Sequence, residues 1–246
     1  MPEKPIIFST QMVQAILEGR KSQTRRIAKD KKLDLFTDRK LQTGFSTFTP
    51  KGMVSVRGYF NDPLKEIGFG ESFIKSDYGQ PGDVLYVRES HYRYGHWIKE
   101  GMTKTGKQKW KFIPATDLHS CRFMDNPPET IEKTTYRKIG WYKRPGIFLP
   151  KELTRIFLKV ENVRVERLDE ISWVDAICEG VDCKPDRNLP LYRNYTEKEM
   201  ITEGLLHNCL TDPRLSFQSL WDIINGSRAP WASNPWVWVI EFSRRE

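Results

Sequence analysis

The sequence has few cysteines, and their spacing is not typical of a metal or redox site. Only four of the 246 residues are Cys, no two of them form a C-x-x-C pair, and no His lies at zinc-finger spacing from Cys178 or Cys183. We therefore expect no structural zinc. Because the interior of the cell keeps thiols reduced, free cysteines are the simpler interpretation.

Long apolar stretches are also missing. No run approaches the roughly 18 apolar residues that a membrane span needs, and the N-terminal segment lacks the apolar core and cleavage site of a signal peptide. We therefore expect a cytoplasmic protein with no membrane partner. The P-loop, G-x-G-x-x-G and H-E-x-x-H motifs are absent as well, so we expect no cofactor and no bound metal.

Positive charge is in excess. The chain has 40 Lys and Arg against 32 Asp and Glu, a net charge of +8, and its aromatic content of 12% excludes a mainly disordered chain. Excess positive charge bears on partners more than on fold, and nucleic acid or a phosphorylated small molecule is the first candidate. Charge alone leaves open the alternative of a protein that is merely basic.

Hydrophobic periodicity predicts several strands and three short helices. Ser172 is the expected N-cap of the middle helix, with Asp175 at the capping-box position. The mixture of scattered strands and short helices indicates an α+β fold built around a small β-barrel. The expected helices cover 9–19, 172–179 and 216–225, and the clearest expected strands cover 53–59, 84–88, 156–166 and 236–242.

A basic segment, GRKSQTRR, follows the first expected helix at residues 19–26. It places four cations and two hydroxyl groups in eight residues, so it can present donors to a phosphate or to the edge of a base. The alternative is a solvated helix end whose Lys and Arg side chains offset the helix dipole.

Four segments stand in order along the chain: GRKSQTRR, PGDVLYVRE, RVERLDEISWVDAICEGV and NPWVWVIEF. Together they resemble the ASCH domain family, whose signature G-x-K-x-x-T-x-R the first segment fits, and in particular its longer phage and prophage members. This resemblance implies one ASCH domain over residues 1–246, with a PUA-like β-barrel, short flanking helices and loop insertions at about 30–78 and 182–212.

The resemblance implies a site for RNA, DNA or a modified nucleoside in a basic cleft beside the motif. Some compact family members are amidohydrolases that remove the acyl group from N4-acetylcytidine with a lysine, a threonine and a glutamate. The matching positions in this chain are Lys21, Thr24 and Glu179. Binding without turnover is the leading interpretation. The alternatives are hydrolysis of an acylated cytidine or related base, and a phage-encoded module that binds a protein partner.

The residues themselves allow this chemistry. Lys21 and Thr24 are three residues apart, which would place them on one side of a helical turn. A desolvated lysine can lose its proton near neutral pH and activate the Thr24 hydroxyl, while Glu179 protonates the leaving amine. Each residue also has a simpler role: Lys21 can contact phosphate, Thr24 can cap a turn, and Glu179 can neutralise the basic loop.

A second group of candidates lies in the middle of the chain. Glu89 follows a strand end, where pocket residues are common, although it can also pair with Arg88 or Arg93. Trp141 and Tyr142 lie among cations, as in base-stacking surfaces, although core packing is the default role of Trp. The full set of candidate ligand-binding residues is Arg20, Lys21, Arg25, Arg26, Glu89, Trp141, Tyr142, Lys143 and Arg144.

Overall fold

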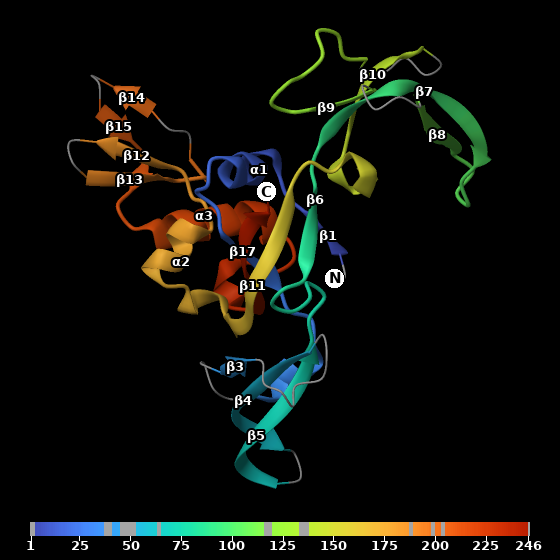
Figure 1. The fold of residues 1–246 in the computed structure, drawn as a ribbon. Coiled ribbons are helices and arrows are strands. Elements are labelled where there is room, and N and C mark those ends of the chain that lie inside the picture. Colours follow the sequence, from blue (N-terminus) through green and yellow to red (C-terminus); the bar gives the residue numbers. More distant parts are fainter. Residues whose placement is uncertain are drawn as a thin grey trace. The chain divides into compact units, whose positions relative to one another are not determined.

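A computed structural model of the chain describes residues 3–36, 41–44, 53–62, 65–115, 120–132, 138–186, 189–197, 200–202 and 205–245 (Figure 1). The fold of these residues is mixed α and β, with many strands and three α-helices. The chain divides into two compact units, which we call unit 1 and unit 2. Unit 1 comprises Met1–Lys4, Gln14–Leu85 and Leu158–Glu246, and unit 2 comprises Pro5–Val13 and Tyr86–Phe157.

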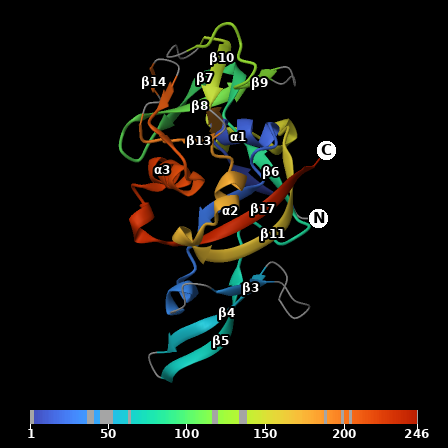
Figure 2. The same ribbon diagram turned by 90° about the vertical axis from the view of Figure 1, so that its left-hand side faces the viewer.

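The largest sheet has five strands in the order β1-β6-β11-β17-β2. Strand β17 runs beside β11 (Figure 2), and its other neighbour in the sheet is β2. Residues 236–240 of β17 are all buried. The strand that the sequence predicts over 236–242 is therefore confirmed, and it is largely buried. The strand bounds are β1 Glu3–Ile7, β2 Gln23–Ile27, β6 Val84–Arg88, β11 Phe157–Arg167 and β17 Trp236–Arg245.

The three helices are α1 (Thr10–Leu17), α2 (Trp173–Cys178) and α3 (Pro213–Asn225). Helix α2 begins as predicted, because the Ser172 side chain accepts from the Asp175 backbone N–H and Asp175 reaches back to the cap. Helix α3 begins earlier than the apolar periodicity indicates, because Asp212 caps it with Pro213 in its first turn. None of the helices in the described ranges is long and apolar enough to cross a membrane.

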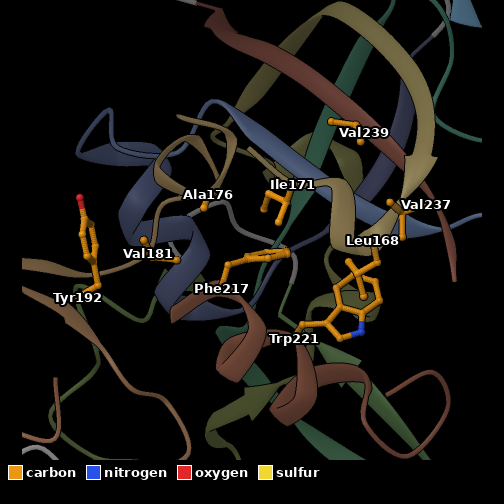
Figure 3. Packing of buried hydrophobic residues seen from close by; sticks show 9 residues of the cluster. All are labelled: Leu168, Ile171, Ala176, Val181, Tyr192, Phe217, Trp221, Val237 and Val239. Atoms are coloured by element: carbon orange, nitrogen blue, oxygen red, sulfur yellow. The ribbon is translucent and has the colours of Figure 1, made fainter. Parts of the chain in front are cut away.

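A hydrophobic cluster in unit 1 joins α2 and α3 to the face of β17 that carries Val237 and Val239 (Figure 3). Phe217 and Trp221 of α3 point into this cluster, and their ring centroids lie 6.2 Å apart. This packing fixes the position of α2, on which the candidate site depends. The cluster consists of Leu168, Ile171, Ala176, Val181, Tyr192, Phe217, Trp221, Val237 and Val239.

Smaller sheets fill the two segments that we expect to be insertions. That these segments are insertions stays a prediction. Segment 30–78 contains the sheet β3-β4-β5, and segment 182–212 contains β12-β13-β16 and the pair β14-β15. Their bounds are β3 Gln42–Gly44, β4 Met53–Asp62, β5 Lys65–Lys75, β12 Cys183–Asp186, β13 Leu189–Arg193, β14 Met200–Thr202, β15 Leu205–His207 and β16 Cys209–Leu210.

Unit 2 contains a sheet of order β10-β7-β8, in which β9 also pairs with β7. A tight turn around Gly106 joins β7 to β8. Strand β10 lies in a segment rich in aromatic residues and proline. The bounds are β7 His91–Met102, β8 Gln108–Pro114, β9 Cys121–Phe123 and β10 Gly140–Arg144.

Two expectations about backbone structure need comment. Lys21 and Thr24 do not share a helical turn: Thr24 lies in β2, which pairs antiparallel with β17. That prediction is wrong because the partner strand, not local spacing, sets the conformation of this segment. The five-stranded sheet is open in the described residues, with β1 and β2 at its edges, so a PUA-like barrel stays a prediction.

Candidate functional site

The segment that leads into β2 lies against the C-terminal end of α2. The last carbonyl groups of a helix have no partner within the helix, and here three carbonyl groups at this end accept hydrogen bonds from the GRKSQTRR segment. These contacts hold the motif against α2. They are Ser22 N to Cys178 O at 3.0 Å, Lys21 Nζ to Glu179 O at 2.7 Å, and Arg20 Nη1 to Gly180 O at 3.1 Å.

Lys21 and Glu179 form a buried ion pair. Lys21 Nζ lies 2.8 Å from Glu179 Oε2, and the side chains are 0% and 2% exposed. Burial lowers the pKa of the Lys21 ammonium, and the Glu179 carboxylate acts against that shift. The structure thus brings two of the three proposed catalytic residues into direct contact, although they lie 158 positions apart.

Arg25 holds the other oxygen of the Glu179 carboxylate. Arg25 Nη1 lies 3.2 Å from Glu179 Oε1, while Nη2 lies 3.3 Å from Asp175 Oδ2 and also bonds to Glu166. The Arg25 side chain is completely buried. Glu179 is therefore fixed from two sides, by an ammonium and by a guanidinium.

Arg164 extends this ion network to further strands. Its Nε lies 3.1 Å from Glu166 Oε2 and its Nη2 lies 3.1 Å from Asp175 Oδ1. Its Nη1 bonds to Glu241 of β17. The network thus links β2, β11, β17 and α2, and it has a structural role whatever else it does.

The close approach of the motif to α2 depends on a glycine. Gly180 has φ of +80°, a conformation that disfavours residues with a Cβ. A Cβ atom at Gly180 would lie 2.8 Å from the Lys21 Cβ and 3.0 Å from the Ala15 Cβ. Only glycine therefore fits between α2, α1 and the motif.

Thr24 is buried in β2 and pairs in register with Ile240 of β17. Because side chains alternate along a strand, Thr24 and Arg26 belong to one face of β2, and Gln23 and Arg25 belong to the other. Burial lowers the pKa of Arg26, and Tyr78 and Glu179 act on it electrostatically in the opposite direction. Contact of the Thr24 hydroxyl with Lys21 or with Glu179 stays a prediction.

Strand β2 contains buried side-chain donors without a hydrogen-bond partner in the part of the chain that the structure describes; Arg25 was already a predicted ligand-binding residue, whereas the sequence analysis missed Gln23. Among the described residues, the side-chain Nε2 of Gln23 and Nε of Arg25 have no hydrogen-bond partner. Buried polar groups are almost always paired, so each is a donor that a ligand oxygen or a water molecule would satisfy. The position of Gln23 inside the motif was the available signal.

Arg20 lies at the margin of this site. Its side chain is 36% exposed and pairs with Glu18 at 2.7 Å and with Asp182 at 3.4 Å. Arg20 is therefore more accessible to a ligand than the buried Lys21 that follows it.

In unit 2, the buried Glu89 pairs with neither of its sequence neighbours. Its two oxygens each lie 2.9 Å from nitrogens of Arg155, which also lies 2.7 Å from Asp125. This bidentate pair corrects the expected partners Arg88 and Arg93. It gives Glu89 a structural contact, and a ligand role for Glu89 stays a prediction.

Trp141 and Tyr142 belong to opposite faces of β10, since consecutive strand residues alternate. Tyr142 is 5% exposed and its hydroxyl donates to Lys138 O at 2.8 Å. Trp141 packs edge-on against Tyr94 at 5.4 Å. The two rings therefore cannot act together on one ligand surface. The exposed Lys143 follows Tyr142 in the chain and lies on the same face of β10 as Trp141.

Comparison of the chain with protein-family models, with curated proteins and with solved structures gives no significant match. The ASCH resemblance thus rests on the four motif segments alone.

Proposed function

We propose that this chain is an ASCH-type protein with a PUA-like fold that binds RNA, DNA or a modified nucleoside, and that the ligand's base is held beside the G-x-K-x-x-T-x-R motif. The observation that carries the proposal is the buried contact between Lys21 and Glu179, with Arg25 on the second carboxylate oxygen. The motif and the glutamate come from distant parts of the chain, as the resemblance requires.

The chemistry of the pair suits a nucleobase. A carboxylate accepts from an exocyclic amino group such as cytosine N4, and an ammonium donates to a ring or carbonyl acceptor. The unpartnered donors of Gln23 and Arg25 add capacity for further acceptor atoms. Since Lys21 and Glu179 are covered, a ligand must separate the pair or shift a neighbouring segment to reach them.

A second candidate function is hydrolysis of the N4 amide of an acylated cytidine. The lowered pKa of Lys21 favours it, because a neutral amine can act as a base. Lys21 would take the proton from the Thr24 hydroxyl, whose oxygen attacks the amide carbonyl carbon. The C–N bond then breaks, Glu179 relays the proton held by Lys21 to the leaving N4 amine, and water releases the acyl group from Thr24.

Mass spectrometry of the ligand separates the two candidates. Purified protein is incubated with N4-acetylcytidine, free and within an oligonucleotide, and both binding and loss of the acyl mass are followed. A binder retains the ligand unchanged. An enzyme releases cytidine, and Thr24→Ala then abolishes release, whereas Thr24→Ser retains part of it.

Binding by the variants completes the test. Losing the neutral Thr24 hydroxyl should weaken binding only about 2- to 10-fold, whereas Lys21→Ala removes a cation and should weaken it more. Lys29→Ala, at an exposed lysine eight positions along the chain, is the matched control. If Lys21→Ala binds as the control does, Lys21 is not part of the site.

A further inference from the structure

The excess positive charge of the chain lies entirely in unit 2. Unit 2 has 15 Lys and Arg against 7 Asp and Glu, whereas the rest of the chain has 25 of each. A compact unit with this imbalance attracts polyanions and repels other cationic surfaces. The positive charge of unit 2 therefore needs an explanation other than the Lys21 site, which lies in the charge-balanced unit 1.

One face of the β10-β7-β8 sheet alternates cations with aromatic rings; we call it the aromatic face. The register pairs Trp97 with Phe112 and Lys99 with Trp110. The Trp97 and Phe112 rings lie 5.2 Å apart, and Lys99 Nζ lies 6.0 Å from the Trp110 ring. Alternation along the strands places these four residues on one side, and all four are at least partly exposed. The aromatic face consists of Trp97, Lys99, Trp110, Phe112, Tyr142 and Arg144.

Arg144 lies at the other end of this face among three rings. Its guanidinium carbon is 4.7 Å from the Trp97 and Phe112 ring centres and 4.3 Å from that of Phe148. Within the described ranges it has no ion-pair partner, and burial lowers its pKa. A guanidinium stacked on rings still presents its N–H edge, which matches the geometry of a phosphate.

A second guanidinium strengthens this anion-binding character. Arg144 is opposite the buried His91 in the strand register, and Arg93 follows on the same face of β7. One nitrogen of Arg93, Nη1, is buried and has no hydrogen-bond partner in the described part of the chain. Arg93 and Arg144 both act electrostatically on His91. An anion at this end would therefore gain two cationic donors.

We propose that unit 2 binds single-stranded nucleic acid on the aromatic face, with bases against Trp97 and Trp110 and a phosphate at Arg144. Rows on one face of a strand are about 6.7 Å apart, wider than the roughly 3.4 Å rise per base in a duplex strand. Extended, unpaired bases can match this spacing, whereas a duplex hides its base faces. The proposal is independent of the Lys21 site, because every residue it uses belongs to unit 2.

Fluorescence anisotropy tests the proposal with labelled oligouridylate and oligothymidylate of about 20 nucleotides, a length that covers one or more typical single-strand sites. The same thymidylate annealed to its complement serves as the duplex probe. We expect both single strands to bind more tightly than the duplex. Affinity should fall steeply between about 50 and 200 mM salt, because each phosphate contact releases counterions.

Variants locate the surface. Trp110→Ala should weaken binding roughly 5- to 100-fold, the range for loss of one stacked base, and Arg144→Gln should weaken binding and flatten its salt dependence. Lys99→Glu changes an exposed side chain and tests the face without risk to the core. The controls are Tyr59→Ala and Arg57→Gln, exposed residues of unit 1, neither of which should change oligonucleotide affinity.

Three results would overturn the proposal. The first is failure of folded wild-type protein to bind either single strand. The second is equal or tighter binding of the duplex, or of inorganic polyphosphate of matched charge, which would leave stacking without a role. The third is an unchanged affinity for the single strands both in Lys99→Glu and in whichever of the separate variants Trp110→Ala and Arg144→Gln is folded.

Discussion

Gly180 illustrates how one residue sets the distance between Lys21 and α2. Its φ of +80° disfavours any side chain, and an added Cβ atom would lie only 2.8 Å from the Lys21 Cβ. Gly82 is a matched control, because its φ is +90° but a Cβ there would meet no atom within 4 Å. Comparing alanine at the two positions separates backbone strain from crowding.

We expect Gly82→Ala to lower the unfolding free energy by about 1–2 kcal/mol, the cost of a left-handed backbone with a Cβ. Gly180→Ala should cost about 1–3 kcal/mol more, because it also overpacks against Lys21 and Ala15. Urea denaturation of both variants measures the difference. Equal losses would mean that the contact between α2 and the motif is loose.

His91 makes unit 2 sensitive to acid. It is 2% exposed, and burial lowers its pKa from 6.5 to about 4. Because the folded-state pKa is the lower one, the unfolded chain takes up the proton first as pH falls. The contribution of neutral His91 is complete above about pH 6.5 and is lost progressively down to about pH 4, by up to about 3 kcal/mol.

The measurement is the unfolding free energy at about pH 7.5 and pH 4.5, above and inside this window. His91→Gln cannot titrate, so its stability should change less between the two pH values than that of the wild type. Parallel losses in the two proteins would assign the acid sensitivity to other groups.

At the scale of single residues, the sequence predicted which residues to consider for the candidate site, but not the ion pairs that they form. The family resemblance implied Lys21, in the motif, and Glu179, in the later segment RVERLDEISWVDAICEGV, and the structure brings the two into contact. The carboxylates around Arg25 could not be found this way, because Glu166 and Asp175 lie 141 and 150 positions from it. No local pattern encodes which distant acid pairs with which base.

At the scale of secondary structure elements, Arg25 is the central connection between β2 and α2. It contacts three carboxylates and is fully buried, so replacing it leaves acids in a low-dielectric environment without their partner. Removal of one partner from a buried ion network typically costs about 3–5 kcal/mol. An exposed pair typically contributes about 1 kcal/mol or less.

Arg25→Met should therefore lower the unfolding free energy by about 3–5 kcal/mol. The control is Arg57→Met in β4, which removes the exposed ion-pair partner of Glu71. It should lower the unfolding free energy by about 1 kcal/mol or less. Thermal and urea unfolding report both values. Near-wild-type stability of Arg25→Met would show that the network does not hold α2 in place.

Elements with strong local signals were predicted correctly, and elements that depend on pairing were not. The cap at Ser172 and the apolar run of β17 are encoded within a few residues. Strand β2 is mostly polar and basic, strand β10 mixes aromatic and basic residues, and neither shows a clear period of two. Their conformation comes from hydrogen bonding to β17 and β7, which periodicity cannot reveal.

At the scale of the whole molecule, the net charge is divided unevenly between the two units. Unit 1 pairs its charges internally, including four carboxylates around Arg25 and Arg164. Unit 2 keeps the full net charge of +8. The composition of the complete chain therefore understates how basic unit 2 is, and the sequence alone did not reveal the division.

The central claim is that the Lys21–Glu179 site recognises a nucleobase. Isothermal titration calorimetry with free cytidine and free N4-acetylcytidine tests it most directly, because a free nucleoside lacks the phosphates that unit 2 would bind. The proteins compared are the wild type, Lys21→Met and the exposed-site control Lys29→Met, each shown to be folded by its melting transition.

We predict saturable binding of at least one nucleoside to the wild type and to Lys29→Met. In Lys21→Met the affinity should be lowered at least about 10-fold, the loss expected for one charge-assisted hydrogen bond. Absence of binding to folded wild-type protein, or equal affinity in Lys21→Met, would contradict the claim.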